Sequence, residues 1–334
     1  MTYRIGIIGG DGIGPEVVAE AVRCIDATGV PYEATRFDLG WERYERDGVV
    51  LPDEDLEAIR KLDAVLLGAV GAAAGKGAGI VERGILLRLR FELDLYVNLR
   101  PFVAAPDARD PDIDLVVVRE NTEGVYAGEG GFLRKGTPHE VATQGSVNTR
   151  MGVERCVRFA FDLARSRARR HLTLVHKTNV LTFAGDLWQR TFDAVAIEYP
   201  DVTTSYNHVD AACIYLVQDP SRYDVIVTDN MFGDIITDLG GAIAGGHGRS
   251  ASANLNPART GPSLFEPVHG SAPDIAGTGQ ADPRAAIVSA AMMLEFLGEP
   301  AAGAQIRRAV DRSDDVIGST SEIGDAISAR VAGR

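Results

Sequence analysis

The sequence predicts an α/β protein with about two domains. Short runs rich in β-branched residues alternate with amphipathic stretches along the chain, a pattern typical of sheets covered by helices. The length of 334 residues exceeds what one hydrophobic core usually serves, so two domains are expected. Hydrophobic residues make up 45% of the chain, an ordinary share for a globular protein that buries a core.

The expected strands are short and apolar. They cover Tyr3–Ile8, Asp63–Leu67, Leu115–Val118, Leu172–Val175 and Asp224–Thr228. Helices are expected over Pro15–Thr28, Ile85–Leu95, Met151–Arg165, Asp186–Glu198 and Asp282–Leu297, and a further helix begins near Gly233. Two helix starts carry clear signals. Pro15 suits the first helical position because its missing N–H is not needed there, and Asp282 is a good N-cap before Pro283.

The segment Thr137–Val147 follows a glycine-rich stretch and has no helical pattern. It is expected to be a projecting β-arm, and an ordinary surface hairpin is the alternative. A second segment, the loop Val70–Ile80, is unusually rich in alanine and glycine. Neither segment reads as a linker, so the domain boundaries are not visible from composition.

Charge and composition exclude several classes of protein. The formal net charge of -13 disfavours nucleic acid and anionic membranes as partners. A basic run at Arg165, Arg167, Arg169 and Arg170 is interpreted as a solvated helix end, because no aromatic residues interleave to stack on bases. Three widely spaced cysteines fit a reducing compartment. With no signal-peptide pattern and no apolar stretch that could span a bilayer, a cytoplasmic location is expected.

A glycine-rich loop, residues 9–15, joins the first strand to the first helix, where a Rossmann fingerprint for a dinucleotide would lie. The spacing fails, because the third glycine of that fingerprint falls on Pro15 in one register and the second falls on Asp11 in the other. A standard Rossmann fold is therefore not expected. Glycines permit tight turns, so the loop is either a cofactor wall or a plain strand-to-helix turn.

Three arginines occupy positions typical of binding residues. Arg90 lies on an expected helix, Arg100 follows Asn98-Leu99, and Arg119 ends an apolar strand. A guanidinium binds a carboxylate through two parallel hydrogen bonds, so converging arginines suit a dicarboxylic acid. Each arginine taken alone is more often part of a surface ion pair.

Two aspartates form a candidate metal site. Asp234 and Asp238 are four residues apart on an expected helix, so they share one face. Neighbouring carboxylates are tolerated when Mg²⁺ or Mn²⁺ lies between their oxygens, and the alternative is that both face solvent near a helix N-terminus. Asp210 is a possible third ligand, and the lack of a Cys/His cluster argues against zinc.

Lys177 and Tyr126 are candidate acid–base residues. Lys177 follows a buried strand, where desolvation would lower its pKa and suit it to proton transfer, although a lysine that extends to water is commoner. Tyr126 lies in the glycine-rich loop after Arg119, and its phenol is either a general acid or a packing group.

Six motifs, in order over nearly the whole chain, resemble the isocitrate/isopropylmalate dehydrogenase family of β-decarboxylating dehydrogenases. They are residues 10–16 (GDGIGPE), 98–101 (NLRP), 118–124 (VRENTEG), 176–181 (HKTNVL), 230–238 (NMFGDIITD) and 266–274 (EPVHGSAPD). Within the family the chain is most similar to members that act on 3-isopropylmalate.

The resemblance implies a two-domain fold that differs from the Rossmann fold. Residues 1–100 and 246–334 would form a cofactor-binding domain. Residues 101–245 would form a second domain for dimerisation, metal and substrate, with the arm near 137–147 pairing with a second subunit. A homodimer with active sites shared between subunits is implied.

The resemblance also assigns roles to the charged residues. The three arginines would bind the malate carboxylates, and Asp234 and Asp238 would bind Mg²⁺ or Mn²⁺ with the partner subunit's Asp210. The partner subunit's Lys177 would help to remove the proton of the 2-hydroxyl group. Tyr126 would protonate the enolate that remains after loss of CO₂.

The expected cofactor is NAD. An acid at position 274 resembles NAD-specific members, because a 2′-phosphate would meet like charge there. The cofactor residues implied by the resemblance are Glu266, His269, Gly270, Ser271, Ala272, Asp274 and Asp282. Some members have asparagine at the last of these positions, near the adenine. The loop Val70–Ile80 would lie beside the nicotinamide.

The helix before Arg90 points to the substrate. Leu86 and Leu87 lie four and three residues before Arg90 and should share its face. Burying an isopropyl group gains roughly 0.8 kcal/mol per carbon, whereas an unpaired carboxylate there would be costly. The predicted reaction is therefore oxidative decarboxylation of 3-isopropylmalate to 4-methyl-2-oxopentanoate and CO₂, a step of leucine biosynthesis.

Other substrates stay open. Segments 119–131 and 252–265 resemble members that act on malate or tartrate, so D-malate, tartrate or another 3-alkylmalate is the first alternative. Isocitrate or homoisocitrate is the second alternative. A non-catalytic regulatory subunit is disfavoured, because Tyr126, Lys177 and the aspartates are present.

Overall fold

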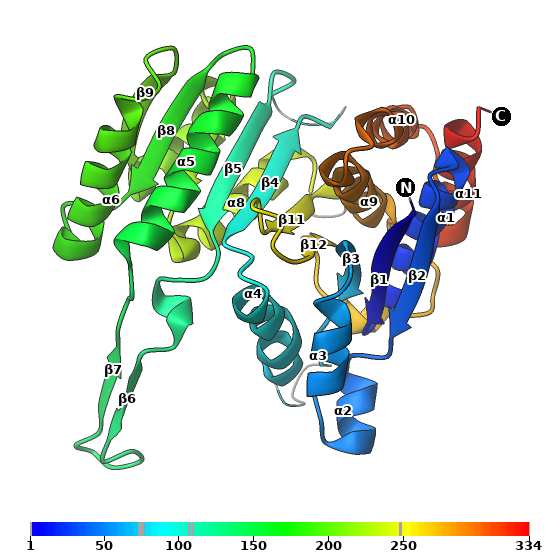
Figure 1. Ribbon diagram of the computed structural model, residues 1–334, viewed down its shortest axis with the longest axis horizontal. Helices are drawn as coiled ribbons and strands as arrows, with labels where there is room; N and C mark the ends of the chain where they lie inside the picture. The colour runs from blue at the N-terminus through cyan, green and yellow to red at the C-terminus, as the bar shows by residue number, and fades with distance from the viewer. Residues whose placement is uncertain are drawn as a thin grey trace. The chain divides into compact units, whose positions relative to one another are not determined.

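The computed structural model describes residues 2–72, 77, 79–105, 108, 110–246 and 249–333 (Figure 1). The chain divides into two compact units, unit 1 (Met1–Leu95 with Gly245–Arg334) and unit 2 (Tyr96–Ala244). The units divide after residues 95 and 244, whereas the sequence predicted boundaries after residues 100 and 245. Part of the loop expected beside the nicotinamide, residues 73–76 and 78, lies outside the described residues.

Unit 1 is built on a sheet of order β2-β1-β3-β12-β11. Its strands are β1 (Tyr3–Gly10), β2 (Tyr32–Phe37), β3 (Ala64–Ala69), β11 (Ala251–Leu255) and β12 (Ser263–Pro267). The first four strands in that order run parallel, and β11 pairs antiparallel with β12. The strands β3, β11 and β12 are buried along their whole length, as expected for strands covered on both faces.

Helices cover the sheet of unit 1. They are α1 (Gly14–Thr28), α2 (Trp41–Asp47), α3 (Asp53–Ile59), the π-helix η1 (Glu82–Leu87), α4 (Arg88–Glu92), the 3₁₀ turn η5 (Pro273–Ile275), α9 (Arg284–Leu297), α10 (Pro300–Asp311) and α11 (Thr320–Val331). The helix α1 packs against α9 and α11, and α9 also packs against α10. Unit 1 therefore joins segments from both ends of the chain, which Figure 1 shows in blue and in orange to red.

Within unit 2 the strands pair in the order β4-β5-β10-β8-β9. Its strands are β4 (Val97–Val103), β5 (Asp114–Glu120), β8 (His171–His176), β9 (Thr203–His208) and β10 (Val225–Thr228). Only β4 runs antiparallel to its neighbour; the other four strands are parallel. Parallel strands finish at one edge of a sheet, and in α/β proteins that edge is where ligands usually bind.

The helices of unit 2 are α5 (Arg150–Ser166), α6 (Thr182–Ala196), α7 (Val209–Gln218) and α8 (Asn230–Ala244), with short 3₁₀ turns η2 (Val125–Ala127) and η3 (Pro220–Arg222). Helices α7 and α8 pack on each other, and α5 packs on α6. Figure 1 shows α5 and α6 in green. Because α8 starts two residues after β10 and α7 starts directly after β9, both helices begin at the same edge of the sheet.

A two-stranded hairpin extends from unit 2 (Figure 1). It consists of β6 (Gly130–Leu133) and β7 (Val141–Gln144), which pair antiparallel and are exposed along their whole length. The segment expected as an arm, Thr137–Val147, covers the turn and the second strand. The first strand was missed because its glycines give no alternating pattern.

Four expected helices differ in their bounds by more than one residue. The helix expected at Asp186–Glu198 is α6, Thr182–Ala196. The helix expected at Ile85–Leu95 is instead a π-helix, Glu82–Leu87, followed by one short α-helix. The helix expected near Gly233 begins at Asn230, because Asp229 Oδ1 accepts a hydrogen bond from Phe232 N (2.7 Å). The last helix begins at Arg284, whose N–H donates to Asp282 Oδ1 (2.9 Å), two residues later than expected. Among the described residues, no helix is long and apolar enough to cross a membrane.

Candidate active site

Several of the predicted site residues lie where the parallel strands of unit 2 end. Arg119 is the second-last residue of β5 and pairs in register with Thr228, the last residue of β10. Lys177 follows the last residue of β8, and Asp210 lies in the first turn of α7, directly after β9. The fold of unit 2 therefore brings these charged side chains to one edge of its sheet.

Arg119 is almost completely buried, and each of the three nitrogens of its guanidinium donates a hydrogen bond. Nε and Nη2 donate to Asn230 Oδ1 at 3.0 and 2.8 Å, and Nη1 donates to Asp234 Oδ1 at 2.5 Å. The stem of Arg119 lies against Gly233, where a Cβ would come within 2.4 Å of its Cγ. Position 233 therefore needs glycine so that α8 can approach the arginine.

Tyr126 completes the environment of Asp234. Its hydroxyl donates to Asp234 Oδ2 at 2.8 Å, and the Arg119 guanidinium lies 5.3 Å from the centre of its ring. Burial alone would raise the pKa of Asp234, but the charges of Arg119 and Arg100 and the tyrosine hydrogen bond outweigh it, so that the pKa is lowered. Asp234 is therefore an anion at neutral pH.

Arg100 connects both aspartates of α8. Its Nη2 lies 3.8 Å from Asp234 Oδ1, and its Nη1 lies 3.9 Å from Asp238 Oδ1. Nη1 also donates to Thr237 Oγ1 at 2.6 Å, and Nε donates to Asn98 Oδ1 at 2.8 Å. Two arginines, two aspartates and a tyrosine thus form one group at the first turns of α8. We call this group the α8 cluster: Arg100, Arg119, Tyr126, Asp234 and Asp238.

The donor set of α8 fits a hard divalent cation. Asp234 and Asp238 lie one helical turn apart, and their side chains are 42% and 63% exposed, so carboxylate oxygens of the kind that Mg²⁺ and Mn²⁺ prefer are accessible. Among the described residues, however, no group of three His, Cys, Asp or Glu side chains is gathered to hold a metal. Asp210 therefore does not join the two α8 aspartates within one described chain.

Asp210 instead contacts Lys177. The lysine Nζ donates to Asp210 Oδ1 at 2.6 Å, and the two side chains are 23% and 67% exposed. The hydrogen bond from Lys177 lowers the pKa of Asp210, which keeps this carboxylate ionised. Lys177 is therefore paired with Asp210 and partly solvated, a state between the two alternatives expected from its place after a buried strand.

The remaining predicted arginine, Arg90, belongs to unit 1. Its Nη2 donates to Glu266 Oε1 at 3.4 Å, and the same oxygen accepts from Asn254 Nδ2 at 2.8 Å. Leu86 packs against the hydrophobic core of unit 1, and Leu87 is partly exposed. Both leucines lie in a π-helix, and their place on the face of Arg90 stays a prediction.

The predicted cofactor loop packs against the glycine-rich turn of unit 1. The carbonyl of Ser271 accepts a hydrogen bond from Ile13 N at 2.8 Å, and a Cβ on Gly12 would lie 1.9 Å from that carbonyl oxygen. Gly12 also has a φ of 58°, which favours glycine. The glycine turn thus serves a close approach between two backbone segments, next to Gly270 and Ala272.

Three side chains of the predicted cofactor set have distinct surroundings. Burial lowers the pKa of His269, whose Nδ1 lies 3.0 Å from the carbonyl oxygen of Gly270, so the ring is neutral with its proton on Nδ1. Asp274 is exposed in η5. Asp282 binds Arg284 through both its oxygens, to the backbone N at 2.9 Å and to Nη1 at 2.8 Å.

Sequence reasoning missed the polar residues that hold the arginines in place, either directly or, for Asn254, through Glu266. These are Asn98, Asn230, Thr237 and Asn254. Asn98, Asn230 and Thr237 lie inside the motifs at 98–101 and 230–238, so a search for hydrogen-bond partners of the arginines within those motifs could have found them. Asn254 lies in no such motif, and its role depends on the pairing of β11 with β12.

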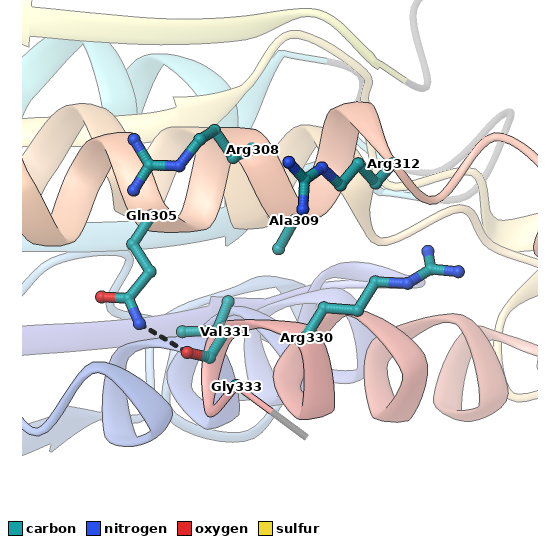
Figure 2. Close-up of a pocket in the computed structure, with 7 residues that line it drawn as sticks. All are labelled: Gln305, Arg308, Ala309, Arg312, Arg330, Val331 and Gly333. Carbon is teal, nitrogen blue, oxygen red and sulfur yellow. Dashed lines mark hydrogen bonds between the residues drawn. The ribbon is translucent and has the colours of Figure 1, made fainter.

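A separate pocket of unit 1, of about 470 Å³, contains none of the predicted site residues (Figure 2). It lies beside the last turns of α10 and α11 and is lined by Gln305, Arg308, Ala309, Arg312, Arg330, Val331 and Gly333. Gln305 Nε2 donates to the carbonyl of Val331 at 2.5 Å, as Figure 2 shows. Arginines at the C-terminal ends of helices are favoured by the helix dipole, which accounts for the charge of this pocket.

Comparison with known proteins identifies the class to which this fold and site belong. A family model described as isocitrate/isopropylmalate dehydrogenase matches residues 4–328. A protein of Corynebacterium efficiens named 3-isopropylmalate dehydrogenase is 58% identical over 340 residues, covering 98% of this chain and 99% of that protein. A Frankia casuarinae protein of the same name is 57% identical and covers 99% of this chain and 100% of that protein.

Solved structures agree with the sequence relatives. An isocitrate dehydrogenase from Methylococcus capsulatus has a TM-score of 0.91 at 40% identity, covering 99% of this chain and 100% of that chain. A β-decarboxylating dehydrogenase from Thermococcus kodakarensis has a TM-score of 0.83 at 38% identity, covering 99% and 97%. The α/β fold class is confirmed, and this chain belongs to the isocitrate/isopropylmalate dehydrogenase family.

Proposed function

We propose that this protein catalyses the NAD-dependent oxidative decarboxylation of 3-isopropylmalate to 4-methyl-2-oxopentanoate and CO₂. This is the step of leucine biosynthesis that 3-isopropylmalate dehydrogenases carry out. The observation that carries the proposal is the α8 cluster, in which two arginines, two aspartates and a tyrosine hydroxyl meet on one helix face. The names of relatives at 57–58% identity over the full length support the choice of substrate.

Charge balance supports a dicarboxylate together with a divalent cation. Arg100 and Arg119 neutralise Asp234 and Asp238, so the cluster has no net charge before anything binds. A malate dianion and a doubly charged cation add equal and opposite charge, so both enter without leaving an uncompensated charge at a partly buried site. The arginine forks then bind carboxylate oxygens of the substrate, a geometry that guanidinium favours.

The proton transfers are assigned to Tyr126 and Lys177. When bound, NAD would supply the hydride acceptor, and a divalent cation held by Asp234 and Asp238 would supply Lewis-acid chemistry. Lys177 accepts the proton of the 2-hydroxyl group through water. The bond between C3 and the departing carboxylate then breaks, its electrons stay on C3, and the Tyr126 hydroxyl supplies the proton that C3 needs.

A homodimer with shared sites is the proposed assembly. The support is that Lys177 and Asp210 pair with each other and, among the described residues, contact no member of the α8 cluster. The exposed hairpin of β6 and β7 also carries Phe132 and Leu133 at 59% and 65% exposure, which suits burial against another subunit. Lys177 and Asp210 would then complete the α8 cluster of the partner subunit.

NAD is the proposed nicotinamide cofactor. Asp274 is exposed, so its carboxylate is available to accept hydrogen bonds from ribose hydroxyls and would repel a 2′-phosphate. The neutral ring of His269 suits stacking or hydrogen bonding to a base, because it brings no charge. Glu266, Gly270, Ser271, Ala272 and Asp282 stay predictions from the family resemblance, as do Arg90, Leu86 and Leu87.

The test is NADH formation by the purified protein with Mg²⁺ and NAD, with 3-isopropylmalate, isocitrate, D-malate and tartrate offered separately. The highest kcat/KM is expected with 3-isopropylmalate. Fastest turnover of malate or tartrate would keep the reaction and refute the substrate, and preference for isocitrate would align the chain with its Methylococcus neighbour. Absence of turnover with all four would refute the proposal. Tyr126→Phe is the control, because it removes only the hydroxyl at Asp234.

A further inference from the structure

One buried contact joins the two parts of the candidate site within a chain. His176 is the last residue of β8 and immediately precedes Lys177. Asp229 immediately precedes α8, the helix that carries Asp234. His176 Nε2 lies 3.3 Å from Asp229 Oδ2, and the two side chains are 0% and 10% exposed.

The imidazole of His176 contacts the first turn of α8 in a second way. Its ring meets the Phe232 ring edge to face, with centroids 5.5 Å apart, while Asp229 Oδ1 accepts the N–H of Phe232 at 2.7 Å. On its other side the imidazole stacks on Trp188 of α6, with centroids 5.8 Å apart. Trp188 is itself fixed by donating from Nε1 to Asn148 Oδ1 at 3.1 Å. The imidazole of His176 therefore packs between Trp188 of α6 and Phe232 in the first turn of α8.

The burial of this pair calls for a reason beyond packing. Neither ring nitrogen of His176 makes an aligned hydrogen bond with any of the residues that the structure describes. Buried polar groups without partners are costly, so an apolar ring at position 176 would be favoured if packing were its only purpose. The carboxylate at 3.3 Å is the group that compensates the imidazole, and the chemistry proposed above uses neither residue.

We propose that His176 and Asp229 form a positioning pair that holds the Lys177 end of β8 in register with the first turn of α8. The proposal rests on the proposed function, because it concerns the rate at which Lys177 transfers a proton. Neither residue touches a reacting atom. The pair acts through Lys177 on one side and, on the other, through Asn230, which follows Asp229 directly and holds Arg119.

Kinetics of three variants test the pair. His176→Phe keeps the ring contacts with Trp188 and Phe232 and removes the nitrogen that faces Asp229. It is expected to lower kcat by about tenfold, because small displacements of a catalytic group are costly, and to leave KM within about twofold. Asp229→Asn keeps an acceptor for Phe232 N and should have a milder effect.

The double variant decides whether the two residues act as a pair. If they do, His176→Phe with Asp229→Asn lowers kcat no further than His176→Phe alone, because the contact is already lost. Multiplied effects, or a lower melting temperature with unchanged kcat, would overturn the proposal. His171→Phe is the matched control, since it makes the same change at the other end of β8, where the imidazole is hydrogen-bonded to Ser205 Oγ. It should leave kcat unchanged.

Amide hydrogen exchange supplies a readout that needs no substrate. Leu181 N bonds to Lys177 O at 2.9 Å, and Gly233 N bonds to Asp229 O at 2.9 Å, so both segments contain protected amides. In His176→Phe both are expected to exchange faster together, and in His171→Phe neither. Faster exchange in one segment alone, or in none, would overturn the pair. If the wild-type protein turns over none of the four substrates offered, the proposed function fails. Hydrogen exchange then still decides whether His176 and Asp229 act as a pair. Should His176→Phe not fold, His176→Gln replaces it, with a smaller expected increase.

Discussion

The two charged groups at the sheet edge of unit 2 are built in opposite ways. In the α8 cluster, Asp234 has Arg119 Nη1 at 2.5 Å, the Tyr126 hydroxyl at 2.8 Å and Arg100 Nη2 at 3.8 Å. Lys177 and Asp210 instead share a single 2.6 Å contact, and the aspartate side chain is 67% exposed. One group is fixed by several partners, and the other by one.

Because of this difference, substitutions in the two groups should affect stability and catalysis differently. In the α8 cluster, buried arginines and several hydrogen bonds set one geometry before any ligand arrives, and removing a member leaves its partners unpaired. A single ion pair whose carboxylate is exposed contributes little to stability and is easily rearranged. Substitutions in the α8 cluster should therefore affect both folding and activity, whereas substitutions at Lys177 or Asp210 should affect activity alone.

The largest effect is expected for Asp234→Asn. The amide still accepts a hydrogen bond from Arg119, but it is a poor ligand for a hard cation and leaves the arginine charge unbalanced. We expect kcat/KM to fall by about 10³-fold or more and the melting temperature to fall as well. Asp186→Asn is the matched control, because Asp186 also lies on a helix of unit 2 and pairs with an arginine, Arg190, four residues on. Activity within tenfold of wild type would refute the metal assignment.

Lys177→Met should separate the two properties most clearly. Loss of a positioned proton-transfer group lowers kcat by about 10²- to 10⁴-fold, whereas the single exposed contact with Asp210 adds little to stability. Calorimetry and steady-state kinetics on one preparation measure both. Lys61→Met, at an exposed position of unit 1, should change neither. A destabilised Lys177→Met with near-normal kcat would reverse the contrast between the two groups.

Arg119→Lys tests the fork geometry of the cluster. Lysine keeps the charge but cannot bond Asn230 and Asp234 together, so buried acceptors lose partners. The free energy of unfolding should fall by roughly 1–3 kcal/mol, and KM for the malate should rise. Arg167→Lys is the control, because Arg167 makes a comparable 2.5 Å contact with the buried Asp224. It should destabilise without a change in KM; equal KM values in both variants would exclude Arg119 from substrate binding.

The sequence predicted this cluster in outline for a physical reason. A spacing of four on a helix places Asp234 and Asp238 on one face whatever the surroundings, and the end of an apolar strand places Arg119 at a sheet edge. The expected strands depended on local apolar runs, and each of them overlaps an observed strand. The family resemblance supplied the fold class, which the comparisons confirm.

What the sequence could not give depends on contacts between distant segments. The π-helix at Glu82–Leu87 has the residue content of an α-helix, so no local pattern distinguishes the two. The pairing of Lys177 with Asp210 follows from the register of β8 with β9, in which His176 lies opposite His208. The chain alone left open whether Lys177 is desolvated or extends to water, and it could not give the partner Asp210, which lies on another strand–helix connection.

The smallest effect distinguishes the two aspartates by their response to salt. Both folded-state pKa values are lowered, so each carboxylate stabilises the fold above its unfolded pKa and this contribution is lost as the pH falls through the folded value. The hydrogen bond from Lys177 lowers the pKa of the exposed Asp210, and 1 M salt should weaken it, because screening acts over about 3 Å at that concentration. Salt should barely change the pKa of Asp234, because its partner Arg119 is 1% exposed and is also bonded to Asn230. Carboxyl ¹³C titrations at low and high salt measure both, and an equal response would show that the cluster is as open to solvent as the pair.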